Sequence, residues 1–262
     1  MNAATGLRLH IQDQAASVIL NRPEKRNALS RALLAELTQT FSDLHQERRV
    51  RSVILTGAGD AFCAGMDLQE IYATASGPQP HAQWQADSVQ LSELIEQILR
   101  FPKPVIAAVN GAALGAGAAL VLAADIAIGS ENLQLGFPEP RRGLVAGIAA
   151  PLLAFRAGGS AAGYLLIGGR SVDAEGALRL GLVQEVVDAD HLWPRATQLA
   201  NDCHASAPES LQLTKRLLNE TIGEQLTALL SAGAAAMATA RTTEAAAEGV
   251  RAFTEKRSPE WP

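Results

Sequence analysis

The chain has 262 residues, enough for one large hydrophobic core or for a core with a smaller appendage. Its net charge of −5 argues against nucleic acid as the main partner, and its two cysteines, neither in a CxxC pair, favour a reducing cytoplasm over a disulfide framework. The five histidines lack metal-ligand spacing, so we expect no metal site. No apolar stretch reaches about 20 residues without glycine or charge, so we expect no membrane span.

The N-terminal part of the sequence alternates strand and helix patterns. Short apolar strands are expected at residues 7–11 and 17–20, and Ser30 is a candidate N-cap for a helix reaching Gln46. The continuous apolar run at 53–56 is typical of a buried parallel strand. Asp67 is a candidate cap for a short helix ending near residue 75, and a longer helix is expected over 84–99. This order predicts a winding α/β fold.

The most informative stretch lies between residues 105 and 147. An apolar strand at 105–109 is followed by a glycine-rich turn, a helix of small residues at 118–124, a strand at 126–129 and then Glu139. Glycines that lead into a helix leave unpaired N–H groups at its N-terminus, which favour a negative oxygen. An oxyanion site beside a lone carboxylate suggests proton abstraction next to a carbonyl. Such turns are also common where they only permit close packing. A dinucleotide fingerprint fits less well, because Leu120 stands where a third small residue is needed.

The rest of the chain turns from mixed to helical patterns. An apolar helix to about residue 157 is followed by Gly158-Gly159-Ser160, which opens another helix. Asp173 is expected to cap a helix over 174–180 that Gly181 ends, before a last strand at 183–187. From His191 onward only helices are expected, over 192–205, 209–220, 225–240 and 243–254. We therefore expect an α/β core over 1–190 and a helical region over 191–262.

Several segments, in order, resemble the enoyl-CoA hydratase/isomerase (crotonase) family, and the resemblance covers essentially the whole length. The ordered set is highly specific, although no single segment is decisive. The segments are Leu20-Asn21-Arg22-Pro23 with Lys25-Arg26-Asn27-Ala28-Leu29, Phe62-Cys63-Ala64-Gly65-Met66-Asp67-Leu68, Asn110-Gly111-Ala112-Ala113-Leu114-Gly115-Ala116-Gly117, Gly136-Phe137-Pro138-Glu139 with Gly143, and Phe253-Thr254-Glu255-Lys256-Arg257 with Pro259.

The resemblance implies a spiral of repeated ββα units, a C-terminal helical region used for trimerisation, and an acyl-CoA substrate. It implies that the backbone N–H groups of Ala64 and Ala116 hold the thioester oxygen and that Glu139 is the catalytic acid and base. It implies no cofactor beyond the coenzyme A of the substrate. The expected substrate and CoA contacts are Lys25, Arg26, Ala28, Gly65, Met66, Asp67, Leu68, Gly115, Pro138, Phe253 and Lys256.

One position departs from the hydratase pattern of the family. Hydratases carry two glutamates beside the catalytic water; the second maps to Glu139, and the first maps to Ala119. Because one base can move a proton from C2 to C4, isomerisation of Δ3- to Δ2-enoyl-CoA is the most economical reaction. Hydration with a single glutamate and a backbone group such as the Gly147 N–H is the main alternative. Decarboxylation, thioester hydrolysis and non-catalytic acyl-CoA binding stay open.

Other charged residues near these motifs are interpreted structurally. Asp125 is expected to cap or pair, and Asp67 to start a helix. Arg141 and Arg142 are unusual so near the site; one of them could bind an acidic acyl group, but a solvated or intersubunit pair is favoured. We expect a homotrimer or a dimer of trimers, because the helical tail is rich in Ala and Leu, including Leu226, Leu229, Leu230 and Met237.

Overall fold

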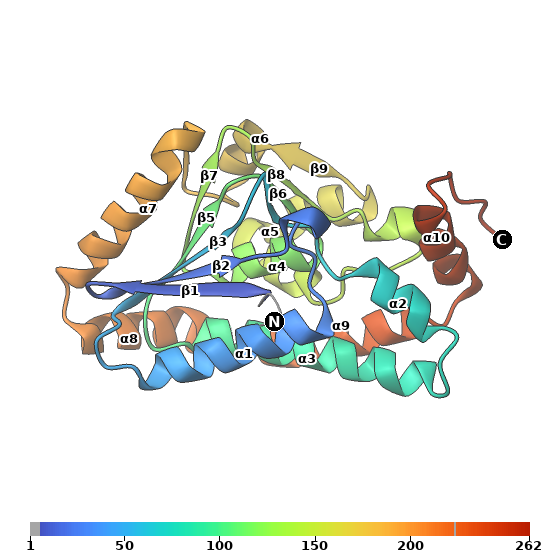
Figure 1. The fold of residues 1–262 in the computed structure, drawn as a ribbon, viewed down its shortest axis with the longest axis horizontal. Coiled ribbons are helices and arrows are strands. Elements are labelled where there is room, and N and C mark those ends of the chain that lie inside the picture. Colours follow the sequence, from blue (N-terminus) through green and yellow to red (C-terminus); the bar gives the residue numbers. More distant parts are fainter. Residues whose placement is uncertain (1–5, 223) are drawn as a thin grey trace, which may run out of the picture.

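A six-stranded sheet forms the centre of the fold (Figure 1). The computed structural model describes residues 6–222 and 224–262. In this sheet β1 pairs antiparallel with β2, and all the other neighbours are parallel. The order across the sheet is β1 (Leu7–Gln12), β2 (Ala15–Leu20), β3 (Ser52–Gly57), β5 (Val105–Val109), β7 (Ile126–Ser130) and β10 (Glu185–Val187).

A second, smaller sheet is formed by strands that alternate along the chain with strands of the large sheet. Its order is β4 (Ala61–Cys63), β6 (Ala112–Leu114), β8 (Gln134–Gly136) and β9 (Ser171–Asp173). The pairs β3–β4, β5–β6 and β7–β8 each give one strand to each sheet before the chain continues into a helix. This arrangement confirms the predicted spiral of ββα units. The four short strands were not predicted, because three residues are too few for a period to show.

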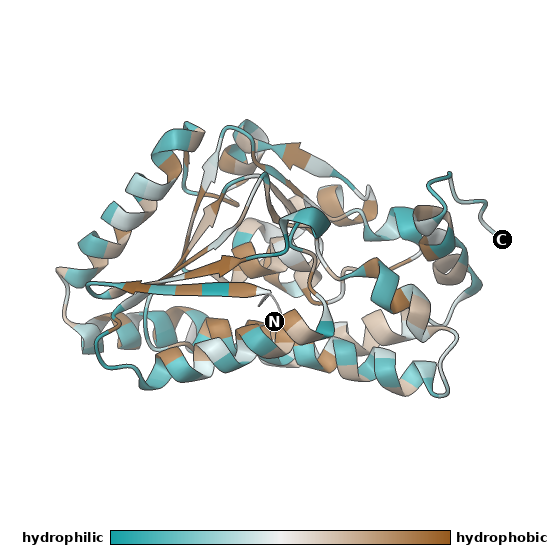
Figure 2. Cartoon of the chain, viewed as in Figure 1, coloured by the Kyte–Doolittle hydropathy of each residue, from teal (hydrophilic) through white to brown (hydrophobic). Residues whose placement is uncertain are grey.

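Helices after each strand pair cover the sheets, and the hydropathy colouring places their apolar faces inward (Figure 2). Helix α1 (Arg31–Gln46) begins as predicted, with the Ser30 side chain accepting a hydrogen bond from Leu33 N–H. Helix α2 (Leu68–Thr74) is capped in the same way by Asp67, and α3 is Pro80–Arg100. Every residue of α4 (Ala116–Ala123) is buried, which its small side chains permit.

Helix α5 (Ala149–Ile167) is the only described helix long and apolar enough by length and composition to cross a membrane. Gly158 interrupts it with φ 81° and ψ 163°, so the predicted helix break at this glycine is confirmed. Each half is far shorter than the ~20 residues that a helix needs to span a bilayer. Most of α5 is nevertheless unburied, and Ile167 at its end is 86% exposed.

The C-terminal segments are helical, and no strand follows β10 among the described residues. They are α6 (Ala174–Arg179), α7 (Ala189–His204), α8 (Pro208–Arg216), the π-helical turn η3 (Leu217–Ile222), α9 (Leu226–Ala240) and α10 (Glu244–Thr254). Helix α7 lies against the large sheet through Leu192, Ala196 and Ala200. Residues from α9 belong to the main core. Whether 191–262 is a separate unit stays a prediction.

The burial of α9 corrects one premise of the oligomer prediction. Leu226, Leu230 and Met237 are buried within their own chain, against α3 and α5, and only Leu229 of the residues offered as an association surface is exposed. Exposed large apolar side chains also occur on other elements, among them Tyr164 and Ile167 of α5 and Leu213, Leu217 and Leu218 of α8 and η3.

Candidate active site

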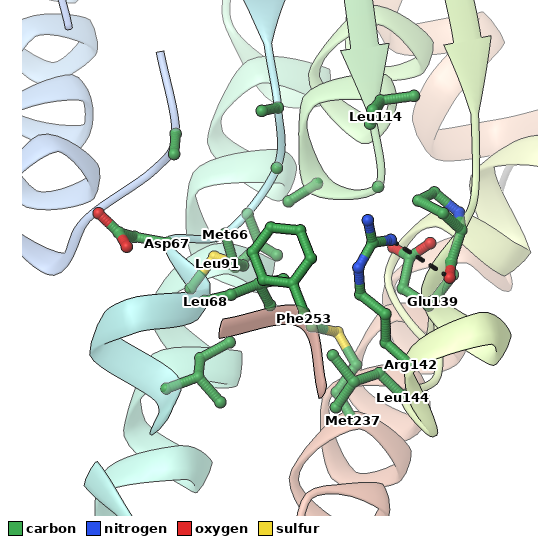
Figure 3. A pocket seen from close by; sticks show the side chains of 18 of the residues that line it. Met66, Asp67, Leu68, Leu91, Leu114, Glu139, Arg142, Leu144, Met237 and Phe253 are labelled. Carbon is green, nitrogen blue, oxygen red and sulfur yellow. Dashed lines mark hydrogen bonds between the residues drawn. The ribbon is translucent and has the colours of Figure 1, made fainter. Parts of the chain in front are cut away.

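A cavity of about 520 Å³ opens where the loops of the small sheet meet α2, α9 and α10 (Figure 3). The structure places every site residue predicted from the sequence in its wall, although those residues come from distant parts of the chain. They are Lys25, Arg26, Ala28, Ala64, Gly65, Met66, Asp67, Leu68, Gly115, Ala116, Pro138, Glu139, Phe253 and Lys256.

Glu139 is held against the turn that begins α4. It follows β8 and starts the short 3₁₀ turn η2 (Glu139–Arg142). Gly115, at the turn into α4, has φ 55° and ψ −117°, and a Cβ atom added there would lie 2.5 Å from Glu139 Oε1. Position 115 therefore needs glycine for two reasons: the backbone conformation disfavours other residues, and a side chain there would collide with the Glu139 carboxylate. The turn and the carboxylate together form one end of the site.

The carboxylate of Glu139 is poorly solvated. Its Oε2 atom is buried and accepts no hydrogen bond from any described residue. Burial raises the pKa of Glu139 from its ordinary value of 4.5 to about 7, and the charge of Arg142 partly opposes that rise. A carboxyl group that is half-ionised near neutral pH can both accept and return a proton, as a general acid–base catalyst must.

The N-terminus of α4 supplies one candidate oxyanion donor. Ala116 is the first residue of the helix, so its N–H has no carbonyl in a preceding turn to donate to. The loop over residues 62–68 approaches this amide closely, since a Cβ atom added at Gly65 would lie 3.5 Å from Ala116 N. The assignment of Ala116 from the sequence is therefore compatible with the structure.

The assignment of Ala64 as the second donor is wrong. The Ala64 N–H donates to the carbonyl of Arg26 at 2.9 Å and is not free to bind a ligand. The Gly65 carbonyl accepts from Leu29 N–H at 2.8 Å, and the two ends of a trans peptide group point in opposite directions. The next N–H, that of Met66, therefore points away from Leu29, and it donates to no described residue. Met66 replaces Ala64 as the candidate donor.

The loop that carries Lys25 and Arg26 is rigid despite its polar sequence. Asn27 is fully buried, with φ 56°, and its side-chain amide donates to the carbonyls of Ala58 and Ala61 at 2.9 and 2.7 Å. This holds the exposed side chains of Lys25 and Arg26 at the cavity mouth, where a phosphate group can meet them.

Asp67 has the structural role predicted for it. Its side chain caps α2 by accepting from Gln69 N–H at 3.1 Å, and it pairs with Arg22 at 3.1 Å. Asp125 is likewise structural, because it pairs with Lys215 at 2.7 Å and accepts from Val105 N–H. Neither carboxylate is therefore free to assist Glu139 in the way a second catalytic acid would.

Arg142 departs from its predicted interpretation, whereas Arg141 is exposed as expected. The Arg142 guanidinium lies inside the cavity beside Glu139 and 4.8 Å from the centre of the Phe253 ring (Figure 3). Burial lowers the pKa of Arg142. This cation–π contact ties the end of α10 to the site, where Phe253 and Lys256 both line the cavity of their own chain.

The remaining wall was not predicted, apart from Ala119, which lines the cavity where hydratases carry their first glutamate. It is largely apolar and comes from α3, α9 and the segment that leads into α5. Its members are Leu91, Leu144, Ala146, Ile148, Ala149 and Met237, and the buried Arg241 accompanies them. These residues carry no motif, because only the packing of distant helices brings them together.

A wound ββα fold whose oxyanion turn faces a glutamate defines the crotonase class of enzymes, and comparison with known proteins agrees. The enoyl-CoA hydratase/isomerase family model matches residues 10–262. A putative enoyl-CoA hydratase of Thermus thermophilus is 40% identical over 93% of this chain and 96% of its own. The 1,2-epoxyphenylacetyl-CoA isomerase of Escherichia coli is 32% identical over 96% of both chains. The crystal structure of an enoyl-CoA hydratase/isomerase from Mycobacterium paratuberculosis superposes with a TM-score of 0.87 at 26% identity, covering 96% of this chain and 99% of that one.

The chain therefore belongs to the enoyl-CoA hydratase/isomerase family. The family acts on acyl-CoA thioesters, so the cavity is the expected place for the acyl group. The relatives carry both hydratase and isomerase names, so the reaction of this member has to be argued from its own site.

Proposed function

We propose that this enzyme isomerises Δ3-enoyl-CoA to Δ2-enoyl-CoA, with Glu139 as its single acid and base. The observation that carries the proposal is the pairing of Glu139 with Ala119 in one cavity. Among the described lining residues, Glu139 is the one carboxylate that is neither exposed, as Glu24 is, nor bonded to a cation and a helix N-terminus, as Asp67 is. Ala119 offers only a methyl group where a second carboxylate would activate water.

The proposed steps use groups already in position. The thioester oxygen accepts hydrogen bonds from the N–H groups of Met66 and Ala116. Glu139 takes a proton from C2, the electron pair moves onto the thioester oxygen as an enolate, and the double bond shifts as Glu139 returns the proton to C4. One preorganised donor of this kind typically lowers the barrier by about 3 kcal/mol. No cofactor is needed beyond the CoA of the substrate.

Hydration of Δ2-enoyl-CoA is the second candidate, because several of the related enzymes carry hydratase names. The structure gives that reaction less support than the sequence suggested. Gly147, whose N–H was offered as a partner for the water, packs against Gly233 of α9 and is not among the described residues that line the cavity. Glu139 would then have to orient the water and deliver the proton alone.

One pair of assays separates these functions. Purified protein is given a 3-enoyl-CoA and, separately, crotonyl-CoA, and the conjugated thioester is followed by its absorbance as it forms or disappears. We expect the first substrate to be converted at least tenfold faster than the second. Faster hydration of crotonyl-CoA would replace the isomerase proposal, and binding of both thioesters without turnover would indicate a non-catalytic acyl-CoA-binding member.

We also propose that the chain works in the cytoplasm as a homotrimer or a dimer of trimers. The support is the unburied apolar surface of α5 and of the turn from α8 into η3, including Tyr164, Ile167 and Leu217. Exposed apolar patches of this kind are usually covered by association. The reducing compartment is supported by two free cysteines, of which Cys63 is buried.

A further inference from the structure

The wall of the cavity carries a buried guanidinium that is incompletely bonded. Arg241 follows α9 directly, one turn after Met237, and both residues line the cavity. The Arg241 side chain is only 4% exposed. The guanidinium donates one hydrogen bond, to the carbonyl of Trp84 at 3.3 Å, and makes no other with any described residue. The nearest carboxylate is that of Asp87, at 3.9 Å.

Asp87 already forms an ion pair with another arginine, Arg31. Arg31 donates to both of its carboxylate oxygens, at 2.7 and 2.8 Å, and Gln83 donates to it at 2.8 Å. The charges that act on Arg241 are therefore Asp87, which stabilises the guanidinium, and Arg31, which opposes it, while burial lowers the pKa of Arg241 to about 10. Glu70 accepts from the Arg31 backbone N–H and does not act on Arg241.

A half-buried arginine elsewhere in the chain is bonded more fully than Arg241. Arg156 lies outside the cavity wall and donates from two of its nitrogens to the carbonyls of Leu122 and Ala124, at 3.0 and 3.1 Å, where α4 ends. Arg241 has one such partner and two remaining nitrogens, and it borders an open cavity. Burying a cation without full pairing is costly, so the arrangement points to an anion supplied from the cavity.

We propose that Arg241 binds a carboxylate at the far end of the acyl group, so that the substrates are CoA thioesters of dicarboxylic acids. The inference rests on the proposed function of the same cavity. Much of the wall of this cavity is hydrocarbon, including Leu91, Ile148, Ala149 and Met237, which suits a methylene chain ending in a charged group. Arg142 is less suited to this role, since it lies at the reacting end beside Glu139 and Phe253.

The test compares enoyl-CoA substrates of equal chain length that end in a methyl group or in a carboxylate, across a series of lengths. We expect the wild-type kcat/KM to favour the carboxylate at one length by about tenfold to a hundredfold, the usual worth of a hydrogen bond to a charged group. In Arg241→Met that ratio should fall to one or below. Asp87 keeps both bonds to Arg31 in this variant, which favours normal folding.

Two further variants keep the result interpretable. Arg241→Lys retains the charge and should keep part of the preference, whereas Arg195→Met removes a surface arginine paired with Glu185 and should leave the ratio unchanged. A wild-type preference for the methyl-ended substrate at every length would overturn the proposal, as would an unchanged ratio in folded Arg241→Met.

Failure of catalysis and failure of this inference are distinguishable by binding. If neither substrate is turned over, calorimetry with the saturated acyl-CoA and carboxyacyl-CoA pair replaces kinetics. Tighter binding of the carboxyacyl-CoA that Arg241→Met abolishes would support the carboxylate site while rejecting the isomerase proposal. Equal binding of the two thioesters by the wild type would reject the carboxylate site.

Discussion

Replacing Glu139 by glutamine should lower activity and, at the same time, stabilise the protein at alkaline pH. The variant keeps the shape of the side chain and removes the base, so kcat/KM should fall by ~10²–10⁴-fold. The stability effect follows from burial, which raises the pKa of Glu139 from 4.5 to about 7. Because each tenfold difference in proton affinity is about 1.4 kcal/mol, keeping the ionised carboxylate in the folded site costs about 3 kcal/mol.

The sign of this effect fixes its pH window. The folded protein binds the Glu139 proton more tightly than the unfolded chain, so wild-type stability falls as pH rises from 4.5 to about 7. Glutamine does not titrate. Urea unfolding at about pH 5 and about pH 8 should therefore show the variant gaining about 2–3 kcal/mol on the wild type, whatever fixed cost the amide carries. A pH-independent difference, or activity within tenfold of wild type, would refute the assignment of Glu139 as a buried general base.

Four other outcomes are expected. Ala119→Glu, if folded, should raise hydration relative to isomerisation, measured with the two thioesters above; like-charge repulsion with Glu139 makes circular dichroism a necessary control. Ala116→Pro removes one N–H at the first position of α4, where proline is tolerated, and should lower kcat by ~10²–10³-fold. A thioester lacking the nucleotide should react far more slowly than the CoA form, because Arg26 and Lys256 lose their phosphates; equal rates would contradict this. Light scattering at micromolar concentration should give a trimeric or hexameric mass, whereas a monomer would leave the apolar face of α5 unexplained.

Local features of the fold were predictable from the sequence because each depends on a few neighbouring residues. Ser30, Asp67 and Asp173 were identified as helix caps, and each accepts a backbone N–H within its own turn. The break at Gly158 likewise needs only a glycine conformation. Leu230 in the helical tail is buried, as expected, but it is buried within its own chain and not by association with another. No local pattern tells whether an apolar helix face packs on its own chain or on a second one.

The site residues that were missed depend on contacts between distant segments. Ala64 and Met66 can be distinguished as oxyanion donors only by the hydrogen bonds that the loop at residues 26–29 makes with their peptide groups. These bonds join segments that are distant in the sequence, so no local pattern predicts them. Arg241 lies at the end of α9 and Asp87 on α3, and these two helices meet only in the folded protein.

Two of the arginines that line the cavity, Arg142 and Arg241, illustrate what the fold adds to a motif. The sequence singled out Arg142 because it stands near Glu139, and an acidic acyl group was one of its possible ligands. In the structure Arg142 is stacked on Phe253, donates to the Pro138 carbonyl at 3.5 Å and acts on Glu139. The arginine that we assign to the end of the acyl group is Arg241, almost a hundred residues further along the chain. We therefore expect specificity for the end of the acyl group and chemistry at its thioester to be carried by different elements. Substitution of Arg241 should change the first, and substitution of Glu139 the second.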